Sequence, residues 1–112
     1  MSETLFVKEI MLYLQQRRDL MCWRNNVGAG VISNRYVQFG CKGHADIFAI
    51  LKGGKFVAIE AKYGKGKQSP DQKKFQEEIE ALGAQYILAY KLEDVIEALP
   101  QYDAPLVVKF RA

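Results

Sequence analysis

The chain has 112 residues, 49% of them hydrophobic, which suffices for one compact core but not for two, so we expect a single domain over residues 1–112. It carries sixteen Lys and Arg against thirteen Asp and Glu, a net charge of +3. No apolar run approaches the length of a membrane span, and two cysteines do not make a disulfide framework. Because the N-terminus shows no signal-like pattern, we expect a cytoplasmic protein in which Cys22 and Cys41 are reduced thiols.

The charges are unevenly distributed along the chain. Residues 1–75 hold thirteen basic and six acidic side chains, whereas residues 76–112 hold three basic and seven acidic ones. This asymmetry favours a polyanion such as nucleic acid as the partner of the first part, although a single exposed lysine is more often simply solvated.

The first predicted element is an amphipathic helix over about residues 4–17. Its apolar residues recur at helical spacing: Phe6, Ile10, Tyr13 and Leu14, with Leu5 and Leu12 widening the stripe. Successive turns of about 100 degrees place Glu9 among these side chains, so its carboxylate points toward the apolar side. Either Glu9 lies at the edge of the stripe and reaches water, or it has a functional role.

Four strands are expected next. Residues 21–26 and 35–40 are typical of short strands, separated by a glycine-bearing loop over residues 27–34. Residues 45–52 and 55–63 form stronger strands, joined by Gly53 and Gly54 in a tight hairpin. Trp23 is more typical of a core residue than of a platform on which bases stack.

A second helix is predicted to begin at "SPDQ". Ser69 is its N-cap, Pro70 its first residue and Gln72 the partner in a capping box, while Gly83 ends it. Residues 85–90 follow as a buried strand and residues 92–99 as a short helix ended by Pro100. Residues 106–110, "LVVKF", add an edge strand or reach a partner chain.

The strand over residues 55–63 carries two charges in an otherwise apolar run. Alternation puts Glu60 and Lys62 on the same face, ~7 Å apart along the strand. A structural salt bridge is one interpretation, but an isolated ion pair on a buried strand costs desolvation. Asp46, at the start of the preceding strand, suggests another, because two carboxylates and a lysine at one end of a hairpin would bind a hard cation and act on a phosphate.

A shared site requires a shifted strand register. A strict two-residue Gly-Gly turn would pair Asp46 with Ala61 and place Asp46 on the face opposite Glu60. A three-residue loop with a bulge and a left-handed glycine, or a break in the strand at Asp46, would bring the two carboxylates together. We therefore predict that the hairpin has one of these features.

Two further motifs are incomplete. The stretch "YGKGKQS" lies between a strand and a helix like a phosphate-binding P-loop, but Gln68 stands where that motif needs Ser or Thr. Cys41 and His44 resemble zinc ligands, yet one more cysteine and no second histidine cannot complete a tetrahedral site. We interpret "YGKGKQS" as a basic loop over a nucleic-acid backbone. The predicted nucleic-acid contacts are Arg24, Asn25, Asn26, Lys42, Lys65, Lys67, Lys73 and Lys74.

These motifs together resemble the VRR-NUC family of the PD-(D/E)XK nuclease superfamily, and in particular its small stand-alone, phage-type members. Asp46 followed by Glu60-Ala61-Lys62 matches the D…ExK element, "GCKGHADI" resembles the glycine-rich approach to the aspartate, and Gln72 and Phe75 match a Q-x-x-F pair. The resemblance covers most of the chain, from Glu9 through "WRNN" to "GAQYILAYKLED". Ala61 replaces the usual valine, which changes little because that position contributes a backbone carbonyl.

The resemblance implies an α/β fold with a restriction-endonuclease-like core: a mixed central sheet flanked by helices, in the order α-β-β-β-α-β with an extra short helix and a C-terminal strand. It implies that Asp46, Glu60 and the carbonyl of Ala61 hold Mg²⁺ or Mn²⁺, with Glu9 completing the acidic shell. Lys62 would orient or activate the attacking water. Gln72 would support the site, unless it serves the capping box alone. The implied catalytic residues are Asp46, Glu60, Lys62, Gln72 and Glu9.

The function implied by the resemblance is that of a metal-dependent, structure-specific DNA endonuclease. Branched DNA such as a Holliday junction is the expected substrate, and a homodimer would supply the two active sites that two symmetric cuts require. One alternative is a nuclease for flap or nicked DNA that works with a helicase. Another is a non-catalytic nucleic-acid-binding module on the same fold, although such a module needs no acids opposing phosphate.

Overall fold

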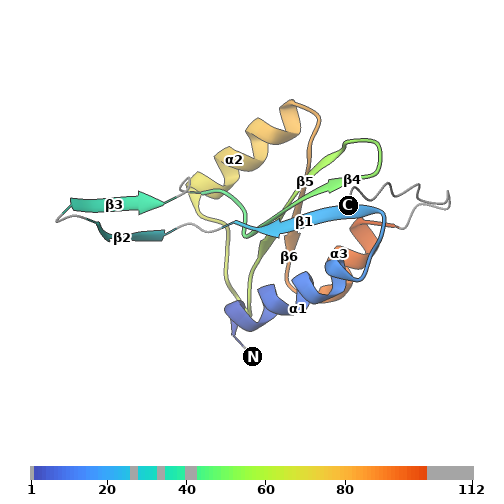
Figure 1. The fold of residues 1–112 in the computed structure, drawn as a ribbon, viewed down its shortest axis with the longest axis horizontal. Helices are drawn as coiled ribbons and strands as arrows, with labels where there is room; N and C mark the ends of the chain where they lie inside the picture. The colour runs from blue at the N-terminus through green and yellow to red at the C-terminus, as the bar shows by residue number, and fades with distance from the viewer. Residues whose placement is uncertain (1, 26–27, 33–34, 40–42, 101–112) are drawn as a thin grey trace, which may run out of the picture.

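The computed structural model describes residues 2–25, 28–32, 35–39 and 43–100 (Figure 1). Within these ranges, the chain forms nine elements in this order: α1 (Glu3–Gln15), β1 (Leu20–Arg24), β2 (Gly28–Ile32), β3 (Arg35–Phe39), β4 (Ile47–Leu51), β5 (Phe56–Ala61), α2 (Pro70–Ala81), β6 (Gln85–Ala89) and α3 (Leu92–Ala98). None of the helices described is long and apolar enough to cross a membrane.

The central sheet has four strands in the order β1-β4-β5-β6. β1, β4 and β5 pair antiparallel, whereas β6 runs parallel to β5 because α2 carries the chain across the sheet between them. β2 and β3 form a separate two-stranded antiparallel sheet that projects from the body (Figure 1). The predicted α/β class, with a mixed sheet flanked by helices, is therefore confirmed.

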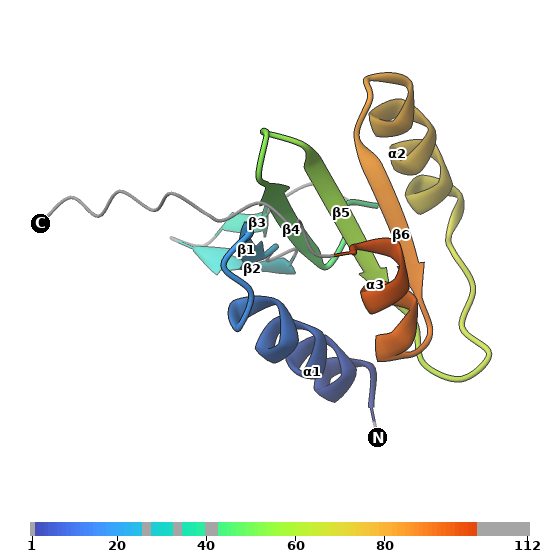
Figure 2. The same cartoon turned by 90° about the vertical axis from the view of Figure 1, so that its right-hand side faces the viewer.

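The helices lie on the two faces of the sheet (Figure 2), and the side chains packed beneath them differ. α1 and α3 lie on one face over an aliphatic core that includes Ile10, Val57, Ile59 and Val95. α2 lies on the other face, over a smaller and largely aromatic cluster. The aromatic members of this cluster are Phe48, Phe56, Phe75 and Tyr86. β5 lies between β4 and β6, so its side chains pack into the aliphatic core on one face and into the aromatic cluster on the other.

The ends of α1 and α2 are fixed by local signals in the sequence. Ser2 caps α1 through its side chain, which accepts a hydrogen bond from the Leu5 N–H. The capping box predicted for α2 is present, with Ser69 as N-cap and Gln72 as its partner. Gly83 ends this helix at φ 93°, a left-handed conformation that favours glycine.

The hairpin between β4 and β5 has the predicted shifted register. Gly54 N–H donates to the Leu51 carbonyl and Leu51 N–H donates to the Lys55 carbonyl, so that three residues form the loop. Gly53 and Gly54 both have positive φ, at 93° and 87°. Ile47 consequently pairs with Ile59, and a bend at Asp46 precedes the strand. The one-residue shift turns Asp46 toward the face that carries Glu60.

Two sequence predictions about the first half of the chain are wrong. Residues 28–32, expected to lie in a loop, form β2, because Val31 and Ile32 favour an extended chain and β3 offers a pairing edge despite the two glycines. Leu5 and Leu12, expected to widen the buried stripe of α1, are 52% and 62% exposed. The predicted strand at residues 106–110 lies outside the described residues.

Arg17, which was expected to end the first helix, instead joins two parts of the fold. Its guanidinium is buried, pairs with the Asp19 carboxylate and donates to the carbonyls of Leu99 and Pro100. It thereby satisfies backbone acceptors at the end of α3 and attaches this helix to the turn between α1 and β1. The hydrogen bonds to Asp19 are the main reason that the pKa of Arg17 is raised.

Candidate active site

Three acidic side chains from separate elements meet at the carboxyl end of β5. Glu60 lies near the end of this strand, Asp46 immediately precedes β4, and Glu3 begins α1. One carboxylate oxygen from each of the three lies within 4.8 Å of those of the other two. This group, Glu3, Asp46 and Glu60, is called the acidic cluster below.

Asp46 is held in place by the backbone on both of its sides. Its Oδ2 accepts a hydrogen bond of 2.8 Å from the Ala61 N–H, next to Glu60 in β5. Its own carbonyl accepts a bond of 2.8 Å from the Asn25 N–H, just after β1. The carboxylate is therefore oriented toward Glu60 by the two strands that flank β4.

Glu60 is an almost completely buried carboxylate, at 2% exposure. Its Oε1 accepts a hydrogen bond of 3.0 Å from Gln72 Nε2 and lies 3.7 Å from Lys62 Nζ. Its Oε2 is also buried but has no hydrogen-bond partner among the described residues. A buried carboxylate oxygen without a partner is costly, so this atom indicates that something else, such as a cation, belongs beside it.

The neighbourhood of Glu60 disfavours its charged form. Burial is the largest cause, followed by the negative charge of Asp46, and together they raise the pKa of Glu60 to about 8. The positive charge of Lys62 acts in the opposite direction without overcoming them. Without a further cation, Glu60 is therefore mainly protonated near neutral pH.

The ion pair between Glu60 and Lys62 is present, as the salt-bridge interpretation requires. That interpretation does not account for Asp46 and Glu3, whose carboxylates converge with that of Glu60 at the end of β5. Divalent cations take such oxygen ligands, and Lys62 remains close enough to act on a group bound next to them. The arrangement therefore favours a cation site with an adjacent ammonium.

Gln72 performs both of the roles that the sequence left open. Its Oε1 accepts a bond of 2.9 Å from the Ser69 N–H, which completes the capping box of α2. Its Nε2 donates to Glu60 across the gap between helix and strand. The same amide thus fixes the start of α2 and orients the carboxylate in β5.

Glu9, which the resemblance placed in the acidic shell, lies elsewhere in the structure. It lines a surface groove of α1 together with Leu5, Leu12 and Leu92, outside the group of acids that meet at β5. Its place is taken by Glu3, six residues and ~9 Å nearer the start of the helix. The prediction placed Glu9 next to Leu5 and Leu12 on the buried side of α1, but Leu5 and Leu12 face solvent.

Glu3 had a recognisable signal in the sequence. It precedes the buried Phe6 and Val7 by three and four residues, so it lies one turn earlier on the same side of α1, although Glu3 itself is exposed. It also lies in the first turn of the helix, where a carboxylate is favoured by the helix dipole.

The other predicted site residues that the structure describes lie at the ends of β1 and β5, on the loop after β5 and at the start of α2. Ala61 lies between Glu60 and Lys62, and its proposed role as a carbonyl ligand stays a prediction. Asn25 Nδ2 donates to the Ala45 carbonyl at 3.1 Å, beside Asp46. Arg24 is exposed at the end of β1. Four lysines are exposed on the loop after β5 and at the start of α2: Lys65, Lys67, Lys73 and Lys74. Asn26, Lys42 and Cys41 lie outside the described residues.

Aromatic packing supports the approach to Asp46. The His44 ring stacks on Phe75, with centroids 4.3 Å apart, and lies edge-on to Phe48 at 6.1 Å. The Phe75 of the Q-x-x-F pair therefore holds the segment before Asp46 against α2.

Trp23 contacts Phe48 edge-on but is 37% exposed, so it is only partly a core residue. Cys22 is half-buried, and burial raises the pKa of its thiol.

The structure explains why a glycine stands at position 43, in the segment before Asp46. Its φ is 84°, and a Cβ there would come within 2.7 Å of Asp71 in the first turn of α2. Only glycine allows the chain to pass so close to the helix, which brings the backbone before Asp46 into position.

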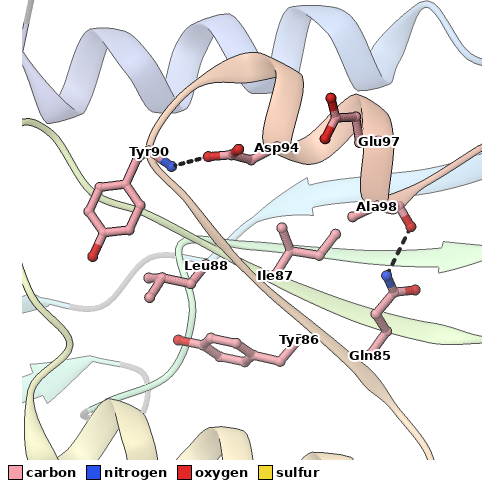
Figure 3. Close-up of a pocket in the computed structure, with 8 residues that line it drawn as sticks. All are labelled: Gln85, Tyr86, Ile87, Leu88, Tyr90, Asp94, Glu97 and Ala98. Atoms are coloured by element: carbon pink, nitrogen blue, oxygen red, sulfur yellow. Dashed lines mark hydrogen bonds between the residues drawn. The ribbon is translucent and has the colours of Figure 1, made fainter.

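A hollow of about 590 Å³ elsewhere on the surface is less suited to a phosphate (Figure 3). It lies along β6 and α3, and its charged lining residues are Asp94 and Glu97. Asp94 accepts hydrogen bonds from the backbone N–H groups of Tyr90 and Lys91, and Gln85 donates to the Ala98 carbonyl. These contacts fix α3 on the edge strand, and the two carboxylates would repel a phosphate.

In comparisons with known proteins, no family model matches the chain, and no curated protein or solved structure shows significant similarity to it. The chemistry of the site therefore has to be inferred from its own residues.

Proposed function

We propose that the protein is a metal-dependent nuclease, a DNA endonuclease that holds Mg²⁺ or Mn²⁺ at Glu3, Asp46 and Glu60. The observation that carries this proposal is the buried, unpartnered Oε2 of Glu60 within a cluster of three converging carboxylates. Oxygen ligands are those that these hard cations prefer. Such an ion would offset the charge that burial and Asp46 otherwise disfavour at Glu60.

The residues around the cluster fit hydrolysis of a phosphodiester. A bound divalent ion polarises the phosphate and makes water more acidic near neutral pH. Lys62, whose Nζ lies 3.7 Å from Glu60, orients the attacking water and offsets negative charge that builds up on the phosphate. Gln72 and the Ala61 N–H keep Glu60 and Asp46 in place, so that the site needs little rearrangement.

We propose further that the fold is restriction-endonuclease-like and that the chain is a small VRR-NUC-type enzyme. Support comes from the observed order of helices and strands, from the shifted hairpin and from the placement of Asp46, Glu60, Lys62 and Gln72 in one site. Branched DNA cut by a homodimer is our preferred substrate and assembly, because two symmetric cuts need two sites. Flap or nicked DNA is the alternative substrate.

The test is cleavage of end-labelled four-way junction, flap and linear duplex DNA in Mg²⁺ and in Mn²⁺. The comparison uses Asp46→Asn, which keeps an oxygen that can accept the Ala61 hydrogen bond but removes the charge. The matched control is Glu78→Gln, an exposed residue of α2. We expect metal-dependent cutting by the wild type and by Glu78→Gln, and at least ~10²-fold slower cutting by Asp46→Asn.

Binding of the ion is measured separately by calorimetry with Mn²⁺. Tight DNA binding without cleavage, equal for wild type and Asp46→Asn, would support the non-catalytic binding module and refute the nuclease. Cleavage of linear duplex and junction at the same rate would refute the preference for branched DNA alone.

A further inference from the structure

The β2–β3 ribbon, Gly28–Ile32 and Arg35–Phe39, is the part of the described structure that the active site does not explain. Its strands pair with each other and with neither edge of the central sheet. The ribbon extends away from the helices and the sheet (Figure 1). An isolated two-stranded ribbon is at best marginally stable in water, so it gains stability by lying against another molecule.

The charge of the sequence indicates what kind of molecule this is. Residues 20–45, which contain the ribbon and both of its attachments, have three basic residues and no acidic one. The rest of the chain has thirteen of each, so this segment carries the whole net charge of +3. A segment without acids is suited to a polyanion.

Both attachments of the ribbon lie beside the acidic cluster. On the β1 side, Asn25 N–H donates to the Asp46 carbonyl at 2.8 Å and Asn25 Nδ2 donates to the Ala45 carbonyl at 3.1 Å. On the β4 side, Gly43 lies against Asp71 at the start of α2. A molecule bound along the ribbon would therefore continue into the site.

We propose that the β2–β3 ribbon is an arm that lies in a groove of double-stranded nucleic acid and positions a phosphate at the acidic cluster. This inference rests on the proposed function and adds duplex as the form of substrate that is bound. A two-stranded antiparallel ribbon fits the major groove of B-form DNA, which is ~12 Å wide. Strands of five residues span ~17 Å, about half a helical turn of the duplex.

The pairing of the ribbon agrees with this role. Gly28 and Gly30 occupy alternate positions of β2 and therefore share one face of the ribbon. Their partners across the pair of strands are Phe39 and Val37. Glycines in a strand permit close approach of another backbone. Arg35 pairs with Ile32 at the end of the ribbon far from the attachments.

The inference is tested with two variants and a matched control. In the first, a Gly-Ser-Gly linker replaces residues 28–39, and the second is Arg35→Ala, which keeps the ribbon. The control is Lys55→Ala, an exposed lysine at the opposite end of β5 from Glu60. Thermal unfolding confirms that each variant is folded. Binding to a labelled duplex and to one of its single strands is measured in Ca²⁺ at several NaCl concentrations.

We expect the linker variant to bind duplex at least ~10-fold more weakly, with a smaller loss for the single strand. Arg35→Ala should reduce the slope of log K against log salt by about one, and Lys55→Ala should leave it unchanged. Unchanged duplex affinity of both variants would overturn the inference. So would equal losses for duplex and single strand, because a groove-binding arm requires two strands.

Two further measurements distinguish the competing explanations. Light scattering reports whether removal of the ribbon converts a dimer into a monomer, which would make the ribbon a dimerisation arm and overturn the inference. Hydrolysis of bis(p-nitrophenyl) phosphate in Mn²⁺ reports on the acidic cluster alone and should be the same with and without the ribbon. Ribbon-dependent duplex binding with no hydrolysis by any variant would refute the nuclease and leave the arm.

Discussion

Along β5, side chains that point to one face enter the aliphatic core, whereas on the other face Phe56 and Ala58 enter the aromatic cluster and Glu60 joins the acidic cluster. Val57, Ile59 and Ala61 are fully buried under α1 and α3. Glu60 is buried to nearly the same extent on the α2 side, but it lies next to Asp46 and Lys62. Its Oε2 has no hydrogen-bond partner among the described residues. The same alternation of a strand thus provides stability on one face and a buried carboxyl group whose ionisation is disfavoured on the other.

This comparison shows how a small domain holds a buried carboxyl group in a fixed position. The core face and the site face share one backbone, so every interaction that fixes Ile59 also fixes Glu60. The ladder to β4 and β6 holds this backbone on both edges. The Glu60 carboxylate therefore lies on a strand that is paired along both edges rather than on a loop.

The largest expected difference between the two faces concerns catalysis. Replacing Lys62 with Met should lower kcat by ~10²–10⁴-fold, because the ammonium beside Glu60 is lost while the three carboxylates remain. The affinity for Mn²⁺, measured by calorimetry, should not fall. The control Lys8→Met, on the exposed side of α1, should cleave DNA at the wild-type rate. A Lys62→Met enzyme with full kcat would show that the pair is structural.

On the core face, the expected effect is on stability instead. Ile59→Ala should lower the free energy of unfolding by ~2–5 kcal/mol, because a fully buried side chain leaves a cavity under α1. The matched control is Ile50→Ala in β4, where the side chain is 40% exposed and the loss should be below ~1 kcal/mol. Urea unfolding measures both. Equal losses would mean that the core does not depend on this face of β5.

The sequence predicted the elements around the site better than it predicted their faces. Strong local signals gave the capping box of α2, its end at Gly83 and the Gly53-Gly54 hairpin, all of which are confirmed. The requirement that Asp46 and Glu60 share a face predicts the shifted register that the structure shows. Short-range chemistry of this kind depends on a few neighbouring residues, so it can be read from the sequence.

Errors arose where tertiary packing decides between local alternatives. In α1, Phe6, Ile10 and Leu14 of the predicted stripe are buried, but packing on the sheet extends the buried face to Val7 and leaves Leu5 and Leu12 exposed. That choice brings Glu3 rather than Glu9 to the cluster. In the same way, β2 contains two glycines and was predicted as a loop, although pairing with β3 makes it a strand.

The pH dependence of stability should also distinguish the two faces. Because the pKa of Glu60 is raised to about 8 in the folded chain, its protonated form stabilises the fold, and this contribution is lost as pH rises from about 5 toward 8. We expect the metal-free protein to lose up to about 4 kcal/mol of unfolding free energy over these roughly three pH units, since each unit corresponds to ~1.4 kcal/mol.

Urea unfolding in EDTA at pH 5, 6.5 and 8 measures this loss. Glu60→Gln should flatten the dependence, and Mn²⁺ should restore the stability of the wild type at pH 8. A slope that is the same in wild type and Glu60→Gln would locate the titrating group elsewhere.

The smallest expected effects separate the two functions of Gln72, which connects the site face to α2. Gln72→Ala removes both hydrogen bonds, so it should cost ~1 kcal/mol of stability and ~10-fold or more in kcat. Gln72→Glu keeps an acceptor for the Ser69 N–H and thus the capping box, but it cannot donate to Glu60. With Mn²⁺ present, this variant should keep the melting temperature of the wild type and lose at least as much kcat as Gln72→Ala. Full activity of Gln72→Glu would reduce Gln72 to a helix cap, because only the hydrogen bond to Glu60 links it to the chemistry.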